Sequence, residues 1–329
     1  MKIFESSWFP VLLGVVILIV TCNSIFSSEE KKEDDLFLNE NLSTANEWKT
    51  PDINSLPDDE QGKLIRYGRE LIVNTSLFFG PKGKIAAISN GMDCQNCHID
   101  GGARNFGGCF SAVASTYPKY RERSGRIESI EFRINDCLQR SLNGKPIDST
   151  SKEMQAMVAY LKWIGKDVPK KETPKGAGLE TLEFLNRAAD PEKGKQIFLA
   201  KCASCHGENG QGQFNHDSSF YLYPPLWGQN SYNVSAGLYR ISRVASLVKN
   251  NMPFGQASHN SPQLSDEQAW DAAAFIVSQQ RPEKFFGEDW PKIQTKPVDH
   301  PYGPYADGFS EKQHKYGPFP PIVEARKKK

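Results

Sequence analysis

The chain has 329 residues, enough for about two ordinary domains, and its 38% hydrophobic content is that of a packed protein rather than a disordered one. Forty basic residues against thirty-nine acidic ones leave a net charge of +1. This balance gives no bulk field for holding a nucleic acid backbone, so we expect no nucleic acid partner. Seven cysteines are too few for a disulfide scaffold, and each needs its own explanation.

Residues 1–22 are predicted to be an export or anchoring segment. The stretch 11–20 is a run of ten apolar residues. A membrane span needs about 20, whereas a run of ten is typical of a secretory signal. Cys22 follows at the position where a lipoprotein signal carries its acylated cysteine, and an uncleaved membrane anchor is the alternative. In both cases the rest of the chain is exported, so we expect a periplasmic protein.

Residues 23–55 are polar and mixed in charge without apolar periodicity, which predicts a tether. Ordered structure is expected from near Leu56, because the acidic stretch 57–60 is typical of the first turn of a helix. Asp190 and Pro191 mark a second helix start of the same kind, with an N-cap and a proline at the first helical position.

A segment rich in Pro, Gly and Lys at 167–185 is predicted to be a linker between two domains, 56–166 and 186–282. Each domain ends alike, in a helix that begins at Ser151 in the first and at a capping box around Ser265 in the second. The body is therefore one unit used twice. No stretch long enough for a strand alternates between apolar and polar residues, so the fold class is predicted to be all-α.

Residues 283–329 differ from the body, since they hold seven prolines and four glycines together with many aromatic residues. The prolines exclude a long helix. We expect an irregular C-terminal arm whose aromatic residues lie against a domain surface, with a disordered tail as the alternative.

Each domain contains one CxxCH motif. Two thiols on one turn can add across the two vinyl groups of a haem, and the adjacent histidine then ligates the iron. Two copies on an exported chain indicate a dihaem c-type cytochrome rather than structural zinc or disulfides. The predicted haem-attachment residues are Cys94, Cys97 and the ligand His98, with Cys202, Cys205 and the ligand His206 in the second domain.

The second haem needs a sixth ligand, for which Met252 is the candidate. It lies in a Met-Pro loop before the last helix, where small c-type cytochromes carry a thioether ligand. His216 and His259 are the alternatives. Pro225 is expected to accept the second hydrogen bond of the proximal histidine through its carbonyl.

The first domain has no second histidine, which leaves Cys109, Cys137 or a lysine for its sixth ligand. Cys137 lies 39 residues after His98, close to the position that Met252 occupies in the other domain. This analogy makes Cys137 the candidate. A thiolate ligand lowers the potential of a haem and is also a nucleophile toward sulfur. If Cys137 is instead an inert core residue, the iron is left open.

The sequence resembles the thiosulfate dehydrogenases that also work as tetrathionate reductases, which are periplasmic dihaem cytochromes with a His/Cys-ligated catalytic haem. The resemblance extends from about Asp58 to Pro282. Its specific part lies in the first domain. The motifs that carry it are the two CxxCH motifs, YPKYRER at 117–123, RINDC at 133–137, RSLNG at 140–144, YPPLWG at 223–228 and NMP at 251–253.

The resemblance implies that Cys137 ligates haem 1, where thiosulfate and tetrathionate are interconverted. Haem 2 would pass electrons to a small redox partner such as a soluble cytochrome c. Arg123 and Arg133 match the family's active-site arginines, and guanidinium groups suit sulfonate oxygens. A solvated helix face is the alternative for these arginines, because Glu128 and Asp136 lie among them.

Two other functions compete with this enzyme. A pure electron-transfer cytochrome predicts Met or His at both sixth positions, and the first domain has none that is well placed. A haem subunit of a thiosulfate-oxidising complex also has a Cys-ligated haem, but the RINDC and YPKYR stretches favour the stand-alone enzyme. A dihaem peroxidase is disfavoured, because it needs an open iron rather than a thiolate.

Overall fold

The structure is a computed structural model that describes residues 48–216 and 220–328. The predicted export segment, with Cys22, and the tether up to residue 47 lie outside the described residues. No helix in the described ranges is long and apolar enough to cross a membrane.

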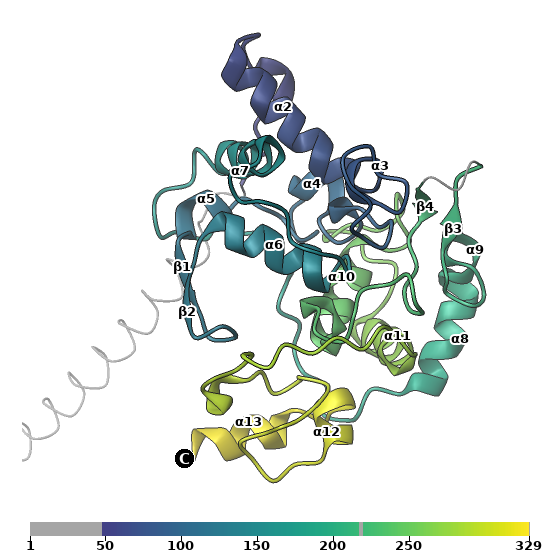
Figure 1. Cartoon of the computed structure of the whole chain (residues 1–329). Coiled ribbons are helices and arrows are strands. Elements are labelled where there is room, and N and C mark those ends of the chain that lie inside the picture. The colour runs from purple at the N-terminus through teal and green to yellow at the C-terminus, as the bar shows by residue number, and fades with distance from the viewer. Residues whose placement is uncertain (1–47, 217–219, 329) are drawn as a thin grey trace, which may run out of the picture. The chain divides into compact units, whose positions relative to one another are not determined.

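The first domain is built on two helices that pack against each other, α2 (Glu60–Val73) and α7 (Lys152–Ile164) (Figure 1). Asp59 caps α2 and Ser151 caps α7 through side-chain hydrogen bonds. The start at Ser151 is as predicted; of the acidic residues expected in the first turn of α2, Glu60 lies there and Asp59 is the N-cap. The shorter helical elements of this domain are η1 (Ile53–Ser55), α3 (Thr75–Phe79), η2 (Cys94–Asn96), α4 (Ile99–Gly102), α5 (Val113–Thr116) and α6 (Ile130–Arg140).

The second domain repeats this plan with α8 (Pro191–Lys201) packed against α11 (Asp266–Ser278). Asp190 caps α8, and Ser265 forms the predicted capping box at the start of α11. The other helical elements of this domain are α9 (Ala203–His206), η3 (Gly237–Tyr239) and α10 (Ile241–Asn251).

A glycine lets the first and last helices approach closely in both domains. A Cβ at Gly68 on α2 would lie 1.9 Å from the carbonyl oxygen of Ala156 on α7. A Cβ at Gly194 on α8 would likewise lie 1.9 Å from the carbonyl oxygen of Asp271 on α11. Only hydrogen fits at either crossing. The same packing solution therefore recurs in both domains, in agreement with one unit used twice.

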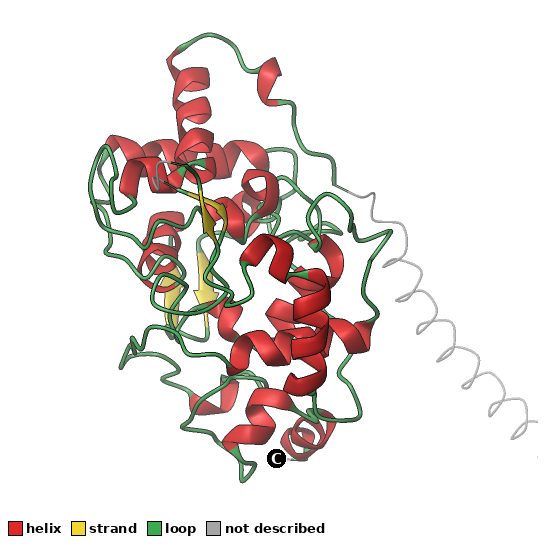
Figure 2. Cartoon of the chain, turned by 90° about the vertical axis from the view of Figure 1, so that its right-hand side faces the viewer, coloured by secondary structure: helices red, strands yellow, loops and turns green. Residues whose placement is uncertain are grey.

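The described chain is mostly helical, as predicted, with two short hairpins that the sequence analysis missed (Figure 2). In the first domain β1 (Lys119–Arg121) pairs antiparallel with β2 (Arg126–Glu128). In the second domain β3 (Gln213–Phe214) pairs with β4 (Tyr221–Tyr223). Strands of two or three residues are too short to show an alternating pattern.

The linker and the end of the tether are packed rather than free. Within the segment 167–185, the Gly178 backbone pairs with that of Cys109, donating to the Cys109 oxygen at 3.0 Å, and Leu182 is buried in the second core. Trp48 is 9% exposed and belongs to the first core, so ordered structure begins before Leu56. Polar composition concealed both segments, because single apolar side chains such as Trp48 and Leu182 fix otherwise polar stretches to the cores.

The C-terminal arm folds against the second domain. Its helical elements are η4 (Ile293–Thr295), α12 (Glu311–Tyr316) and α13 (Pro320–Lys327), which are short, as the prolines require. Phe319 and Ile322 are buried in the same core as residues of α10 and α11. Asp299 is fully buried and accepts a hydrogen bond from the Arg240 side chain at 2.8 Å. The disordered-tail alternative therefore does not hold for the described arm.

The close crossing of α8 and α11 yields a stability prediction. We expect Gly194→Ala to lower the free energy of unfolding by at least about 2 kcal/mol, because the new methyl group must push backbone atoms apart. Thermal unfolding of the haem-loaded protein measures the change. Gly237→Ala is the matched control, since a Cβ there meets no atom within 4 Å. Equal melting temperatures for the two variants would contradict the role of the glycine.

Candidate functional site in the first domain

The first CxxCH motif is held in a form suited to an iron ligand. His98 Nδ1 donates a hydrogen bond to the carbonyl oxygen of Gly108 at 2.5 Å, which fixes the ring and leaves Nε2 for a metal. A Cβ at Gly108, which has φ +74°, would lie 2.3 Å from the carbonyl oxygen of Cys97, so this position requires glycine. Burial lowers the pKa of His98 to about 4. The imidazole is therefore neutral near pH 7, as ligation requires.

The second motif is oriented in the same way, with one correction to the prediction. His206 Nδ1 donates to the carbonyl oxygen of Pro224 at 2.8 Å, not to that of Pro225. The Pro225 oxygen instead accepts from Ser231 Oγ at 3.2 Å. Successive carbonyls in an extended Pro-Pro segment point in different directions, and the sequence alone did not reveal which one faces the ring. Burial lowers the pKa of His206 as well.

Buried donors near these motifs suit the carboxylates of a haem. Arg281 Nε and the Tyr232 hydroxyl are buried and have no hydrogen-bond partner in the described part of the chain. The Arg281 guanidinium lies over the Tyr232 ring, 4.3 Å from its centroid. Burial raises the pKa of Tyr232, and a Cys97 thiolate contributes to the rise, so this pair lies close to the first motif. Buried donors of this kind normally have an acceptor, and a haem propionate fits that role.

The surroundings of Met252 support it over the two histidines as ligand to haem 2. It ends α10 and packs against the same core as Cys202 of the second motif. His216 is exposed. His259 stacks on Phe106 with ring centroids 3.7 Å apart, so its ring is already used in packing. Met252 stays a prediction, supported by the exposure of His216 and the packing of His259.

Cys137 lies on α6 beside the first motif. Its neighbour Leu138 forms a small core cluster that also contacts Cys94. The pKa values of the Cys94 and Cys97 thiols are raised to about 12, mainly by burial, and the charge of a Cys137 thiolate contributes to both shifts. Cys137 therefore lies near enough to both haem-attachment cysteines to influence their charge, and its role as distal ligand stays a prediction.

Cys109, the other cysteine considered as a ligand, has a structural role. It is 6% exposed in the first core, and its backbone pairs with Gly178 of the linker. Its sulfur lies 3.9 Å from Asn105 Oδ1. Cys109 thus joins the linker to the loop that follows the first motif, and Cys137 stays the predicted cysteine ligand.

The predicted arginines converge on one carboxylate. Arg123 and Arg133 both donate to Asp136 Oδ2, the latter at 2.5 Å, while Arg140 Nε donates to Asp136 Oδ1. The side chains of Arg123, Asp136 and Arg140 are only 12%, 8% and 7% exposed. The Arg133 side chain is more open, at 31%, but it too is bonded to Asp136, so a freely solvated helix face is wrong for this group.

Arg133 also couples to the predicted ligand. Arg133 and Cys137 are four residues apart on α6 and so lie on one face. A Cys137 thiolate raises the pKa of Arg133, more than its other neighbours do. Within the described ranges the side chains of Arg123 and Arg133 make no hydrogen bond except to Asp136. Their other N–H groups remain available to a bound anion.

Three residues of this arginine group were missed or misread from the sequence. Asp136 and Arg140 were not assigned a role, although their i, i+4 spacing with each other and the i, i+3 spacing from Arg133 could have indicated a chain of ion pairs. Asp289 of the C-terminal arm binds Arg140 through both carboxylate oxygens, at 2.6 and 2.7 Å. No sequence signal links two residues so far apart.

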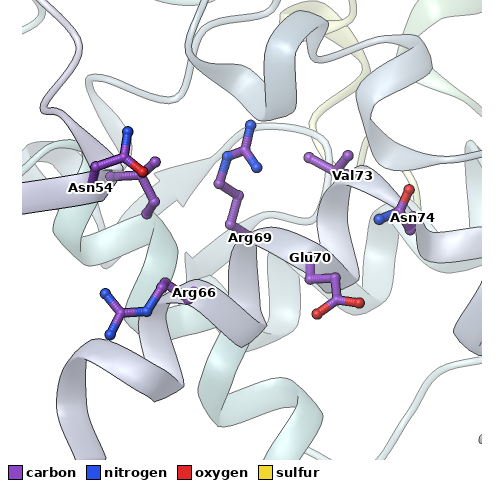
Figure 3. Close-up of a pocket in the computed structure, with 7 residues that line it drawn as sticks. Asn54, Arg66, Arg69, Glu70, Val73 and Asn74 are labelled. Carbon is purple, nitrogen blue, oxygen red and sulfur yellow. The ribbon is translucent and has the colours of Figure 1, made fainter. Parts of the chain in front are cut away.

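The described part of the chain holds no further metal-binding cluster, and its best-formed hollow lies away from this site. No group of three or more His, Cys, Asp or Glu residues there could hold a further metal ion. A shallow hollow of about 410 Å³ lies between η1 and α2, where Figure 3 shows Arg66, Arg69 and Glu70. None of the haem-motif residues or predicted ligands lines it.

Comparison with known proteins identifies the family of this chain. A family model described as the SoxA/TsdA cytochrome c domain matches residues 84–169, and a cytochrome c model matches residues 191–280. A thiosulfate dehydrogenase from Psychrobacter arcticus is 37% identical over 74% of this chain and 71% of its own. One from Allochromatium vinosum is 36% identical over 69% of this chain and 82% of its own. The chain belongs to the thiosulfate dehydrogenase family.

The fold of this family member also matches a solved relative. The structure of thiosulfate dehydrogenase TsdBA from Marichromatium purpuratum, in its as-isolated form, has a TM-score of 0.67 and 28% identity over 75% of this chain. The chain spans about half (52%) of that solved chain. With two cytochrome c domains and two intact CxxCH motifs, this thiosulfate dehydrogenase family member carries two covalently attached c-type haems.

Proposed function

We propose that this protein is a dihaem c-type cytochrome that interconverts thiosulfate and tetrathionate at haem 1, by the reversible reaction 2 S₂O₃²⁻ ⇌ S₄O₆²⁻ + 2e⁻. The observation that carries the proposal is the juxtaposition of Cys137 with Arg133 on α6, beside the first CxxCH motif. A sulfur nucleophile and a guanidinium with free donors are what the coupling of two sulfur dianions requires.

The arginines supply the charge that this reaction needs. Two dianions repel each other, and they can meet only where fixed cations offset the repulsion. Arg123 and Arg133 each donate one hydrogen bond to Asp136, and their remaining N–H groups can donate to sulfonate oxygens. Both guanidiniums are held by a buried carboxylate, so they are already oriented before substrate binds.

Cys137 is proposed to ligate the iron and to take part in sulfur transfer, with His98 as the proximal ligand. When bound, the haem accepts the electrons of the reaction one at a time. In the second domain, His206 and Met252 are proposed as the ligands of haem 2. A His/Met haem has a higher potential than a His/thiolate haem, which suits onward transfer to a small redox partner such as a soluble cytochrome c.

The proposed location is the periplasm. Its support is the apolar stretch 11–20 and the covalent haems of an exported cytochrome. Cys22 would hold the protein at the membrane if acylated, and an uncleaved segment would do the same.

Turnover of purified, haem-loaded protein tests the function. We expect activity in both assays, thiosulfate with an oxidised acceptor and tetrathionate with a reduced donor. Cys137→Gly should lower kcat by at least about a thousandfold, because the reacting sulfur is gone, and should leave both haems attached. Cys109→Ser is the control, because that thiol lies in the core rather than at the haem. Retained activity in Cys137→Gly would refute the proposed role.

Substitution of one arginine tests the anion site. We expect Arg123→Gln to raise the KM for thiosulfate between about tenfold and a hundredfold, the usual effect of losing a charge-assisted hydrogen bond. Arg126→Gln is the matched control on the same hairpin. Arg126 is exposed and lies over the Phe132 ring, 4.2 Å from its centroid. Equal KM values for the two variants would show that Arg123 does not contact substrate.

A further inference from the structure

The C-terminal arm reaches the arginine group through Arg140. Each guanidinium nitrogen of Arg140 is engaged, Nε by Asp136 and the two terminal nitrogens by Asp289 at 2.6 and 2.7 Å. The guanidinium also lies over the Phe286 ring, 3.9 Å from its centroid. Both Phe286 and Asp289 belong to the arm, which begins beyond the last residue, 280, matched by the cytochrome c model.

The position of Arg140 controls that of Arg123 and Arg133. Asp136 Oδ1 faces Arg140, while Asp136 Oδ2 receives both of the other guanidiniums. A carboxylate is planar and rigid, so its Oδ2 is oriented by whatever holds its Oδ1. Arg140 is therefore the anchor from which the two substrate-facing arginines are placed.

Asp289 also balances the charge of this group. Without it, three guanidiniums would share the carboxylate of Asp136. Arg140 would then compete for Asp136 Oδ2, and mutual repulsion would spread the cations apart. With Asp289 present, Arg140 is neutralised by its own bidentate partner, and Asp136 remains free to hold the other two arginines.

A second contact fixes the hairpin that carries Arg123. The Trp290 amide donates to the Arg123 carbonyl oxygen at 2.7 Å. Trp290 has φ +62°, a left-handed conformation that is unfavourable for a residue with a bulky side chain. Pro291 packs closely against the turn between β1 and β2. A Cβ at Gly125 in this turn would lie 2.5 Å from Pro291 Cγ. The arm thus holds both the backbone and, indirectly, the guanidinium of Arg123.

We propose that the C-terminal arm is part of the anion site of haem 1, with Asp289 as a positioning residue that sets the geometry of Arg123 and Arg133 through Arg140 and Asp136. The inference rests on the proposed function for the identity of the substrate. The placement of the arginines themselves applies to any sulfur oxoanion. The ligand class is a dianion with sulfonate-like oxygens.

Asp289→Asn in the full, haem-loaded chain tests this role, because it keeps the shape of the side chain and removes its charge. We expect the KM for thiosulfate to rise at least about tenfold while kcat changes less than threefold, since the nucleophile is untouched. The conservative variant Asp289→Glu keeps the carboxylate, so its KM for thiosulfate should lie close to that of the wild type. A purely structural role would not predict rescue together with a KM-specific defect.

The control is Asp307→Asn in the same arm. Asp307 is 5% exposed and holds Arg326 and His314, with no bond to α6. It matches Asp289 as a buried arm carboxylate, so it reports any general loosening of the arm. Circular dichroism on all variants shows whether they remain folded at the assay temperature.

A second readout is independent of turnover, namely the Kd of sulfate measured by calorimetry. Sulfate is a dianion with similar oxygens that is not oxidised in the assay. We expect Asp289→Asn to weaken sulfate binding by the same factor as the rise in KM. If the wild type binds sulfate in an Asp289-dependent manner but does not turn over thiosulfate, the proposed function fails and the role of the arm stands.

Three results would overturn the role of the arm. An unchanged KM and an unchanged Kd would show that the arginines keep their positions without Asp289. A lower KM would show that Asp289 acts only as a negative charge that opposes anion binding, because removing such a charge strengthens the local positive field. The same holds if Asp307→Asn reproduces the defect of Asp289→Asn.

Discussion

Asp136 lies near the end of α6 with three guanidiniums against its two carboxylate oxygens. Burial alone would raise the pKa of this carboxyl, but Arg123, Arg133 and Arg140 outweigh burial and lower it. The carboxylate therefore stays charged, and each arginine is held by it. Through these bonds the hairpin β1–β2, helix α6 and the C-terminal arm are fixed to one another, one residue away from Cys137. The anion site and the sulfur ligand share a single support.

The two cytochrome domains use the same packing for different purposes. Both place a glycine where the first and last helices cross, and both fix the proximal histidine by a backbone carbonyl. They differ in the residue offered to the other face of the haem, proposed as Met252 in one domain and Cys137 in the other. A thioether ligand suits an electron-transfer haem, and a thiolate ligand suits a haem that reacts with sulfur compounds. In this proposal the difference in one ligand gives the two haems their different functions.

Local features of the sequence predicted well. The helix starts and the haem motifs depend on residues within one or two turns of each other, and the structure has the caps at Asp190 and Ser265 as expected. The direction in which a backbone carbonyl points was harder to predict. The carbonyl that accepts from His206 belongs to Pro224, whereas the prediction was Pro225. Contacts across the chain could not be predicted. Arg140 and Asp289 are 149 residues apart, and the arm was recognised only by its composition.

The ligation of haem 1 by Cys137 is the claim on which the proposed chemistry depends, and the electron paramagnetic resonance spectrum of the oxidised protein tests it most directly. A His/thiolate haem gives a strongly rhombic low-spin signal, distinct from that of a His/Met haem. We expect one haem of the wild type to give the rhombic signal and Cys137→Gly to lose it, with the signal of haem 2 unchanged. A wild-type spectrum without that rhombic signal, or one that survives in Cys137→Gly, would contradict the assignment.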